Sequence, residues 1–373
     1  RRQRQMCIRD RDKVEKTIKR NKLIDICKGI GIISIVIGHA SWNIPIGNID
    51  IPIGPFVYLY HLAIFFFCSG FLYKKEENDW GEFLKKKIKA LYFPFVIYSV
   101  SFLLFRNFFI NLGILAGEKT TIGSFVISMT NILTFNSLGE FLSAFWFLPV
   151  MFITMLLYTA IFMYTRKLKD LYSDIVRFCI CLVIGFVGVV ITEKQYGLLY
   201  NMQISYLMVF VVELGHLYKK YEAYIKKYLG ILSTIICGFL LAMVLHMNIG
   251  IVELSKFMVI NRYIFYPVTI IGIAFCISLS SVIDKSEKIG NIFAYIGKNS
   301  FDIMALHFLA FKIVDLVACF LVHDFTNLSV FPHTFIVLWP VYYIVGIGLP
   351  LVLKKMYTCV KAFLNKKLMG RVK

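Results

Sequence analysis

Three ionisable residues lie in the first apolar segment of the chain, where lipid or protein surrounds them. Asp25, Lys28 and His39 all fall within residues 23–42. In a helix, Lys28 and His39 are separated by only about 20° around the axis and by about 16 Å along it. Asp25 comes three positions before Lys28, which allows the two to pair. Ionisable residues in such segments usually face the protein interior or a wet cavity, so we expect this stripe to be functional.

A second histidine, His61, lies in the next apolar segment. Because successive spans run antiparallel, we expect His39 and His61 to lie in the same outer layer of the bundle. Trp146, near the outer start of a later segment, should reach a similar depth. A neutral imidazole can accept a proton near neutral pH. The alternative interpretation is that Lys28 snorkels to the headgroups and that His39 and Trp146 mark the membrane interface.

Other polar residues lie in later apolar segments. His307, in the cytoplasmic half of its segment, either lines a cavity or packs against a neighbouring helix. Lys312 and Asp315 are three positions apart, which predicts a structural ion pair. We expect Glu213 and His216 to lie at the membrane interface.

The composition of the chain indicates that these polar residues belong to a membrane protein. The chain has 373 residues, of which 58% are hydrophobic and 17% charged, against roughly 45–50% and about 25% in soluble domains. This composition excludes a soluble enzyme, a disordered chain and a disulfide scaffold. Most of the nine cysteines lie in apolar segments, where thiols act as small hydrophobes. We expect no metal site.

The apolar segments predict an all-α integral membrane protein, a bundle of about ten transmembrane helices. A span needs ~20 apolar residues. Two shorter stretches, 121–138 and 286–297, are predicted to be amphipathic helices at the interface. The ten predicted spans cover approximately residues 23–42, 55–73, 90–112, 141–164, 176–192, 198–218, 228–247, 263–283, 299–322 and 333–353.

The basic residues predict the orientation. The formal net charge is +19, and the lysines and arginines gather before the first span, after the last and in every even-to-odd loop. The odd-to-even loops hold few of them. Because cytoplasmic loops are enriched in Lys and Arg, both termini are expected in the cytoplasm. Topology therefore accounts for the charge, and we expect membrane lipids but no nucleic acid as partners.

The chain divides into four segments by composition. Residues 1–11 are basic, lack an apolar core and are expected to be a non-native leader. Residues 12–22 form a cytoplasmic basic segment, and 354–373 form a cytoplasmic basic tail. Residues 23–353 are the transmembrane domain.

The polar residues lie in a set of motifs that resembles the acyltransferase 3 family of membrane-bound O-acyltransferases, in particular its fucose 4-O-acetylase-like subgroup. The resemblance extends from about residue 21 to the last span. It rests on the order and spacing of NKLIDICKGIGIISIVIGH (21–39), YHLAIFFFCSGFLYKK (60–75), FLKKKIKALYFPF (83–95), FWFLPVMF (145–152) and IGKNSFDIMALH (296–307).

The resemblance implies transfer of an acyl group, most often acetyl, from cytoplasmic acetyl-CoA to a hydroxyl of an extracytoplasmic or lipid-linked carbohydrate. The family's basic-x10-His motif matches Lys28 and His39, and its second histidine motif matches His61. These three are the expected catalytic residues, with His39 as the general base.

The remaining site residues would hold the two substrates. The family's basic stretch falls on a lysine cluster that is expected to bind the CoA phosphates or to act only as a topological signal. We expect Trp146, Asp25 and His307 to contact the substrate. The implied location is a bacterial inner or plasma membrane. The lysines of the cluster are Lys86, Lys87 and Lys89.

Two other classes of function stay open from the sequence. A transporter or flippase of a polar lipid-linked molecule would also need intramembrane charges, and discontinuous helices would favour it. A membrane sensor or assembly subunit would need no chemistry at all.

Overall fold

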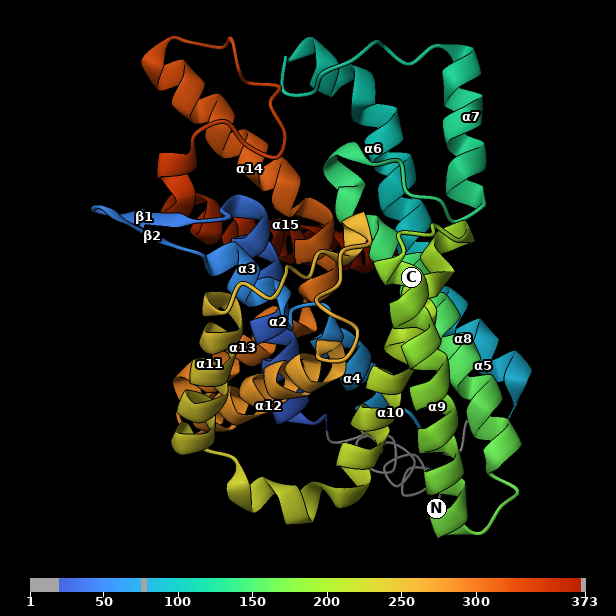
Figure 1. Cartoon of the computed structure of the whole chain (residues 1–373). Coiled ribbons are helices and arrows are strands. Elements are labelled where there is room, and N and C mark those ends of the chain that lie inside the picture. Colours follow the sequence, from blue (N-terminus) through green and yellow to red (C-terminus); the bar gives the residue numbers. More distant parts are fainter. Residues whose placement is uncertain (1–19, 75–78, 370–373) are drawn as a thin grey trace, which may run out of the picture.

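The computed structural model describes residues 20–74 and 79–369, and most of these residues are helical (Figure 1). The predicted leader 1–11 and most of the basic segment 12–22 lie outside the described residues. The described residues also contain a hairpin of two short antiparallel strands, β1 (Ile44–Ile46) and β2 (Ile49–Ile51). None of the eight described cysteines forms a disulfide.

Many of the helices follow one another through short connections, whereas longer loops join α11 to α12 and α14 to α15. A 3₁₀ segment, Glu140–Trp146, leads directly into α8, and a π-helical turn, Ile88–Tyr92, joins α5 to α6. The helices are α2 (Lys22–Ala40), α3 (Ile53–Tyr58), α4 (Ala63–Phe71), α5 (Trp80–Lys87), α6 (Phe93–Asn111), α7 (Ile122–Leu133), α8 (Phe147–Thr165), α9 (Asp170–Glu193), α10 (Met202–Ile225), α11 (Ile231–His246), α12 (Phe265–Asp284), α13 (Glu287–Lys298), α14 (Ser300–Val322) and α15 (Trp339–Met369).

Eight helical stretches within the described residues are long and apolar enough to cross a membrane. The predicted spans 198–218 and 228–247 correspond to α10 and α11, which are bent by 104° relative to each other and together count as a ninth candidate. The predicted number of ten is therefore not confirmed, and the location of the termini stays a prediction. The stretches 121–138 and 286–297 do contain helices, α7 and α13.

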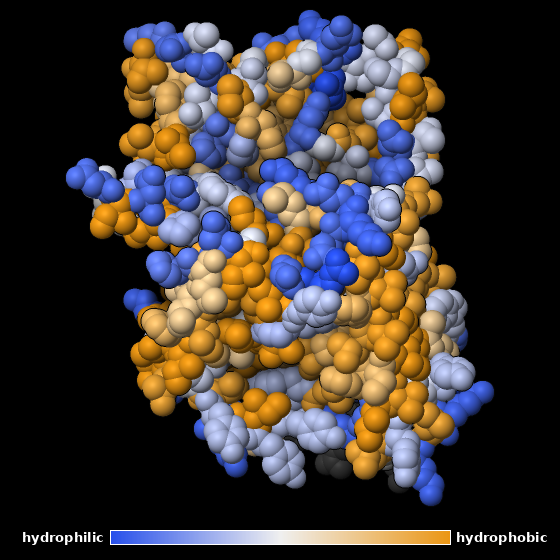
Figure 2. Space-filling model, viewed as in Figure 1, coloured by the Kyte–Doolittle hydropathy of each residue, from blue (hydrophilic) through white to orange (hydrophobic). Residues whose placement is uncertain are grey.

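The surface agrees with a membrane environment. Figure 2 shows a broad hydrophobic area over the lower part of the molecule, bounded by hydrophilic residues above and below. Large apolar side chains are exposed along α9 and α11, including Val183, Ile235 and Phe239. Soluble monomers rarely expose apolar patches of this extent.

Helix α2 lies at the centre of the bundle (Figure 1). Asn21 caps its first turn, accepting a hydrogen bond from the backbone N–H of Ile24 at 3.2 Å. Its glycines let α13 approach closely: a Cβ on Gly29 would lie 2.3 Å from the carbonyl oxygen of Phe293. Small residues at such crossings are typical of helix packing in membranes. The crossing places α13 beside the first half of α2.

Candidate active site

The site begins at the last turn of α2, where His39 is half-buried. Its Nδ1 lies 2.9 Å from Nε2 of His307 on α14. The rings of His39 and Phe308 also stack, with centroids 4.9 Å apart. The residue that the sequence predicts as general base therefore contacts His307 directly.

Backbone contacts assign the tautomers of this histidine pair. Nδ1 of His307 lies 2.9 Å from the carbonyl oxygen of Met304 and 3.1 Å from that of Ile303. Because a carbonyl can only accept, Nδ1 of His307 carries the hydrogen, and Nε2 of the neutral ring is the acceptor. Nδ1 of His39 is then the donor in the pair. Nε2 of His39 is left with its lone pair and makes no hydrogen bond to any described residue.

His307 lies in the first half of α14, as expected, yet it is level with His39 in the last turn of α2. Helix α13 packs beside the first half of α2, and α14 begins only two residues after α13 ends. His307 is seven residues into α14, or about 10 Å, so the late start of α14 brings it level with His39. Its side chain is fully buried.

His61 lies where the second predicted span is broken. Residues Leu59–Leu62 form a turn between α3 and α4, and Nδ1 of His61 lies 3.0 Å from the carbonyl oxygen of Val57. The same reasoning makes Nδ1 the donor and Nε2 the free acceptor. The break therefore fixes the tautomer of a second imidazole.

His39 and His61 line one small cavity of about 40 Å³, together with Trp146. Trp146 comes from the end of the 3₁₀ segment before α8, and Leu254 and Ser255 close the cavity from the loop between α11 and α12. This volume holds about one or two waters. The cavity thus accommodates a hydroxyl group, while a larger substrate would need this loop or Trp146 to move.

Lys28 and Asp25 lie farther down α2. By helical rise they are about 16 Å and about 21 Å from His39, so neither contacts the histidine cavity. Asp25 pairs with Arg20 at 2.7 Å, which corrects the predicted pairing with Lys28. The reason is geometric, because helical side chains tilt toward the N-terminus, where Arg20 precedes the helix. Among the described residues, Lys28 has no ion-pair partner.

The predicted CoA-binding lysines lie on a separate part of the structure. Lys86 and Lys87 are in the last turn of α5, and Lys89 is in the π-helical turn that follows. Lys85 and Lys89 line an open depression of about 640 Å³ between α5 and the start of α6. None of these lysines lines the histidine cavity.

The predicted ion pair between Lys312 and Asp315 is confirmed, at 2.9 Å with both side chains buried. Lys312 also donates to the carbonyl of Leu328 at 2.8 Å, and Asp315 accepts from the backbone N–H of Thr334 at 3.1 Å. The pair therefore anchors the loop that follows α14 against the bundle.

That loop brings His333 close to the end of α2, a position that the sequence analysis missed. Burial lowers the pKa of His333, and the nearby backbone carbonyl of Ala40 offsets part of this effect. Its ring lies 4.4 Å from that of Tyr342 and 6.1 Å from that of Phe311, between centroids. His333 is the first residue of the predicted span 333–353, and its position in that span gave no sign that it lies close to the end of α2.

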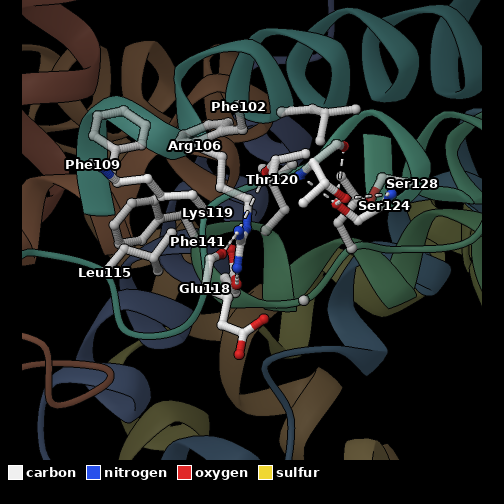
Figure 3. Close-up of a pocket in the computed structure, with 16 residues that line it drawn as sticks. Phe102, Arg106, Phe109, Leu115, Glu118, Lys119, Thr120, Ser124, Ser128 and Phe141 are labelled. Atoms are coloured by element: carbon white, nitrogen blue, oxygen red, sulfur yellow. Dashed lines mark hydrogen bonds and ion pairs between the residues drawn. The ribbon is translucent and has the colours of Figure 1, made fainter. Parts of the chain in front are cut away.

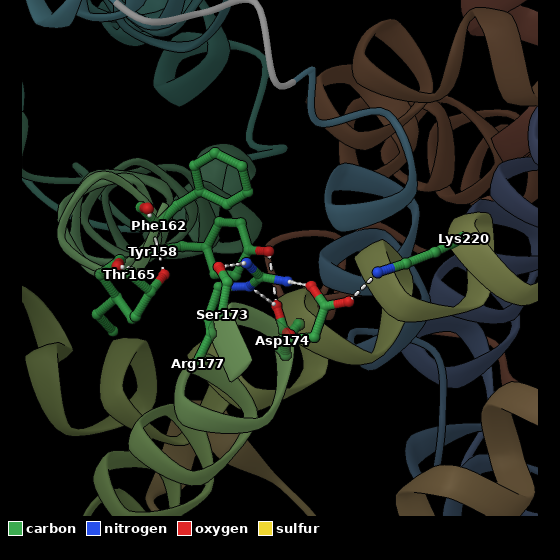
Figure 4. A network of polar contacts seen from close by, with 9 residues as sticks. Tyr158, Phe162, Thr165, Ser173, Asp174, Arg177 and Lys220 are labelled. Carbon is green, nitrogen blue, oxygen red and sulfur yellow. Dashed lines mark hydrogen bonds and ion pairs between the residues drawn. The ribbon is translucent and has the colours of Figure 1, made fainter. Parts of the chain in front are cut away.

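A second polar cluster lies among α8, α9 and α10 (Figure 4). Arg177 donates to Glu213 at 2.8 Å and to Asp174 at 2.7 Å, and Tyr158 donates to Glu213 at 2.7 Å. Glu213 and His216 are both buried inside the bundle, and our expectation that they lie at the depth of the membrane interface stays a prediction. The opposite charge of Arg177 makes burial of the Glu213 carboxylate tolerable.

A family model described as an acyltransferase domain matches residues 21–355. No curated protein and no solved structure matches the chain. The matched region includes His39, His61, Trp146 and His307. It ends beyond Leu353, the last of the residues that we assign to the transmembrane domain.

Proposed function

The chain belongs to the acyltransferase 3 family and is a multi-pass membrane acyltransferase, and on this premise we propose that it is an O-acetyltransferase. The proposed donor is cytoplasmic acetyl-CoA, and the proposed acceptor is a hydroxyl of an extracytoplasmic or lipid-linked carbohydrate. We place it in the fucose 4-O-acetylase-like subgroup and in a bacterial inner or plasma membrane.

The observation that carries the proposal is the hydrogen bond between His39 and His307 beside the cavity. An alcohol is a weak nucleophile, and it becomes effective when a base accepts its proton during attack. Nε2 of His39 has the free lone pair for this step. The His307 ring holds His39 in that tautomer and orientation, as a positioning residue.

The reaction then proceeds by acyl transfer at the cavity. The acceptor oxygen bonds to the thioester carbonyl carbon, and its proton passes to Nε2 of His39. The carbon–sulfur bond breaks, and the CoA thiolate leaves and takes up the proton. His61 supplies a second lone pair at Nε2, which orients the acceptor hydroxyl or shares the proton transfer. The indole of Trp146 would pack against the acceptor.

The donor would enter from the cytoplasmic side. The phosphates of CoA would bind at Lys86, Lys87 and Lys89, where ammonium groups attract anionic oxygen. The extended pantetheine arm would pass Lys28 on its way up α2 to His39. In this arrangement Lys28 and Asp25 act on the donor below the cavity. Lys28 has no acidic partner among the described residues, so its charge is available to the donor.

Turnover of acetyl-CoA tests the proposed function. The purified protein in lipid nanodiscs is incubated with radiolabelled acetyl-CoA and a bacterial cell-envelope glycan fraction, and free CoA and labelled glycan are measured. We expect both to appear together and to depend on the protein. Absence of CoA release and of labelled glycan would contradict the proposal. It would favour a transporter, because discontinuous helices such as the one broken at His61 are typical of transporters.

A further inference from the structure

We propose that a second pocket, between α6, α7 and the 3₁₀ segment Glu140–Trp146, binds a neutral sugar unit of the acceptor, next to the unit that is acylated (Figure 3). The inference rests on the proposed function and adds the length and charge class of the acceptor. The pocket has a volume of about 390 Å³, within the range of small-molecule sites.

Arg106 joins the loop after α6 to the start of the 3₁₀ segment on one side of the pocket. Its guanidinium donates to the carbonyl of Glu118 at 2.6 Å and to a carboxylate oxygen of Glu140 at 3.1 Å. Asn107, on the same helix, accepts from the backbone N–H of Thr120 at 2.6 Å. The loop between α6 and α7 is therefore held to α6 by side chains, and the pocket keeps its shape without a ligand.

Helix α7 turns its polar face into the pocket and its apolar face outward. Ser124 and Ser128 line the pocket together with Thr121 at the cap, at helical spacing. On the other side Ile122 and Ile127 are 88% and 65% exposed. This arrangement suits a helix that faces lipid and encloses a hydrophilic ligand. The Ser128 side chain has no partner among the described residues, so its hydroxyl is available.

Aromatic rings form the opposite wall. Phe102, Phe109 and Phe141 line the pocket, and the rings of Phe109 and Phe141 meet edge to face at 5.3 Å. Figure 3 shows these rings on one side of Arg106 and the two serines on the other. A pyranose has hydroxyls at its rim and C–H groups on its faces. In this pocket the hydroxyl wall can bond the rim of the sugar, and the aromatic wall can pack against its C–H face.

The charges indicate a neutral ligand. Arg106 and Lys119 are balanced by Glu118 and Glu140, so the pocket carries no excess of either sign. A CoA phosphate or an anionic lipid headgroup would require an excess of positive charge. The side chains of Glu118 and Lys119 have no partner among the described residues, which leaves them able to bind sugar hydroxyls.

The 3₁₀ segment connects this pocket to the histidine cavity. Glu140, Phe141 and Leu142 line the pocket, whereas Ala144 and Trp146 line the cavity. Glu140 and Trp146 are six positions apart, which in a 3₁₀ helix corresponds to at most about 12 Å. That distance corresponds to a short oligosaccharide, so an acceptor that fills both sites must have more than one sugar unit.

Binding of neutral sugars to the full chain in phosphatidylcholine nanodiscs tests the inference. The probes are glucose-, galactose- and N-acetylglucosamine-based tetrasaccharides with their monosaccharides, measured by calorimetry without acetyl-CoA. The variants are Ser128→Val and Lys119→Gln. Ser124 is left unchanged because its hydroxyl caps α7 by accepting from the backbone N–H of Thr121. Thr130→Val is the matched control, because Thr130 is on α7 but does not line the pocket.

We expect at least one tetrasaccharide to bind the wild type and Thr130→Val alike, with its monosaccharide binding more weakly. The Ser128→Val variant should lose about fivefold in affinity, as for one hydrogen bond. The Lys119→Gln variant should lose affinity for the tetrasaccharide by a smaller factor. Binding of no probe, equal binding to the serine variant, or displacement by added phosphatidylglycerol would each overturn the inference. The proposed function is tested separately by acetyl-CoA turnover.

Discussion

Nδ1 of His39 lies 2.9 Å from Nε2 of His307, across 268 positions of sequence. This one contact joins the end of α2 to the middle of α14 and fixes which nitrogen of His39 holds the free lone pair. The backbone carbonyls of Ile303 and Met304 accept a hydrogen bond from Nδ1 of His307. They therefore make Nε2 of His307 the acceptor and Nδ1 of His39 the donor in the histidine pair.

The pair predicts how His307 variants behave. His307→Ala removes the acceptor of the His39 N–H, so His39 can adopt the wrong tautomer, and kcat should fall by about 10- to 100-fold, as for loss of an orienting partner. His307→Gln places an amide oxygen where Nε2 was and should keep more activity. The KM for acetyl-CoA should change little in both. Equal activity of the two variants would contradict the positioning role.

The lysines of α5 make a prediction about the donor. Lys86→Ala with Lys87→Ala should raise the KM for acetyl-CoA more than it lowers kcat, because ground-state binding of the phosphates is lost. Lys226→Ala with Lys227→Ala is the control, since it removes two exposed lysines from another predicted cytoplasmic loop. A KM unchanged in the first variant, or raised equally in both, would leave the cluster with a topological role only.

The buried pair of Arg177 and Glu213 makes a prediction about stability. Arg177→Met leaves the Glu213 carboxylate buried without its main partner and should reduce the free energy of unfolding by about 3–5 kcal/mol. Adding Glu213→Gln should restore part of the loss, because no unpaired charge then remains. Thermal unfolding in detergent measures both. If the double variant were less stable than Arg177→Met, the unpaired Glu213 carboxylate would not be the cause of the lost stability.

Orientation is testable at the β-hairpin. Asn48 is exposed at its turn, close after His39 in sequence. With the exposed Cys179 and Cys359 replaced by serine, Asn48→Cys should react with a membrane-impermeant maleimide added outside intact cells. Tyr224→Cys, in a predicted cytoplasmic loop, should react only after permeabilisation. The reverse pattern would place His39 on the cytoplasmic side.

Much of the fold follows from sequence because bilayer thickness sets the length of a span. The apolar segments predict α2, α6, α8, α9, α12 and α14 with small boundary errors. Hydropathy says nothing about how helices stagger, however. The depth of His307 depends on α13 packing beside α2, which is a tertiary contact between glycines and backbone.

The candidate site was partly predictable, because the length of a span also fixes the depth of a residue near its end. His39, His61 and Trp146 could be assigned to one layer, since each comes near the outer end of its segment. The partners of buried charges could be predicted within one helix, as for Lys312 and Asp315, but not between separate elements. Asp25 binds Arg20 outside the helix, and Glu213 binds Arg177 from α9, because these choices depend on which helix faces are in contact.

Acetyl transfer by His39→Ala tests the central claim most directly. The variant, compared with wild type in nanodiscs at equal amounts of monodisperse protein, should lose about 10²–10⁴-fold in the rate of labelled-acetyl transfer, the usual range for a general base. Its KM for acetyl-CoA should stay near the wild-type value, because the proposed donor site is remote. A folded His39→Ala protein that transfers acetyl at a near wild-type rate would contradict the account.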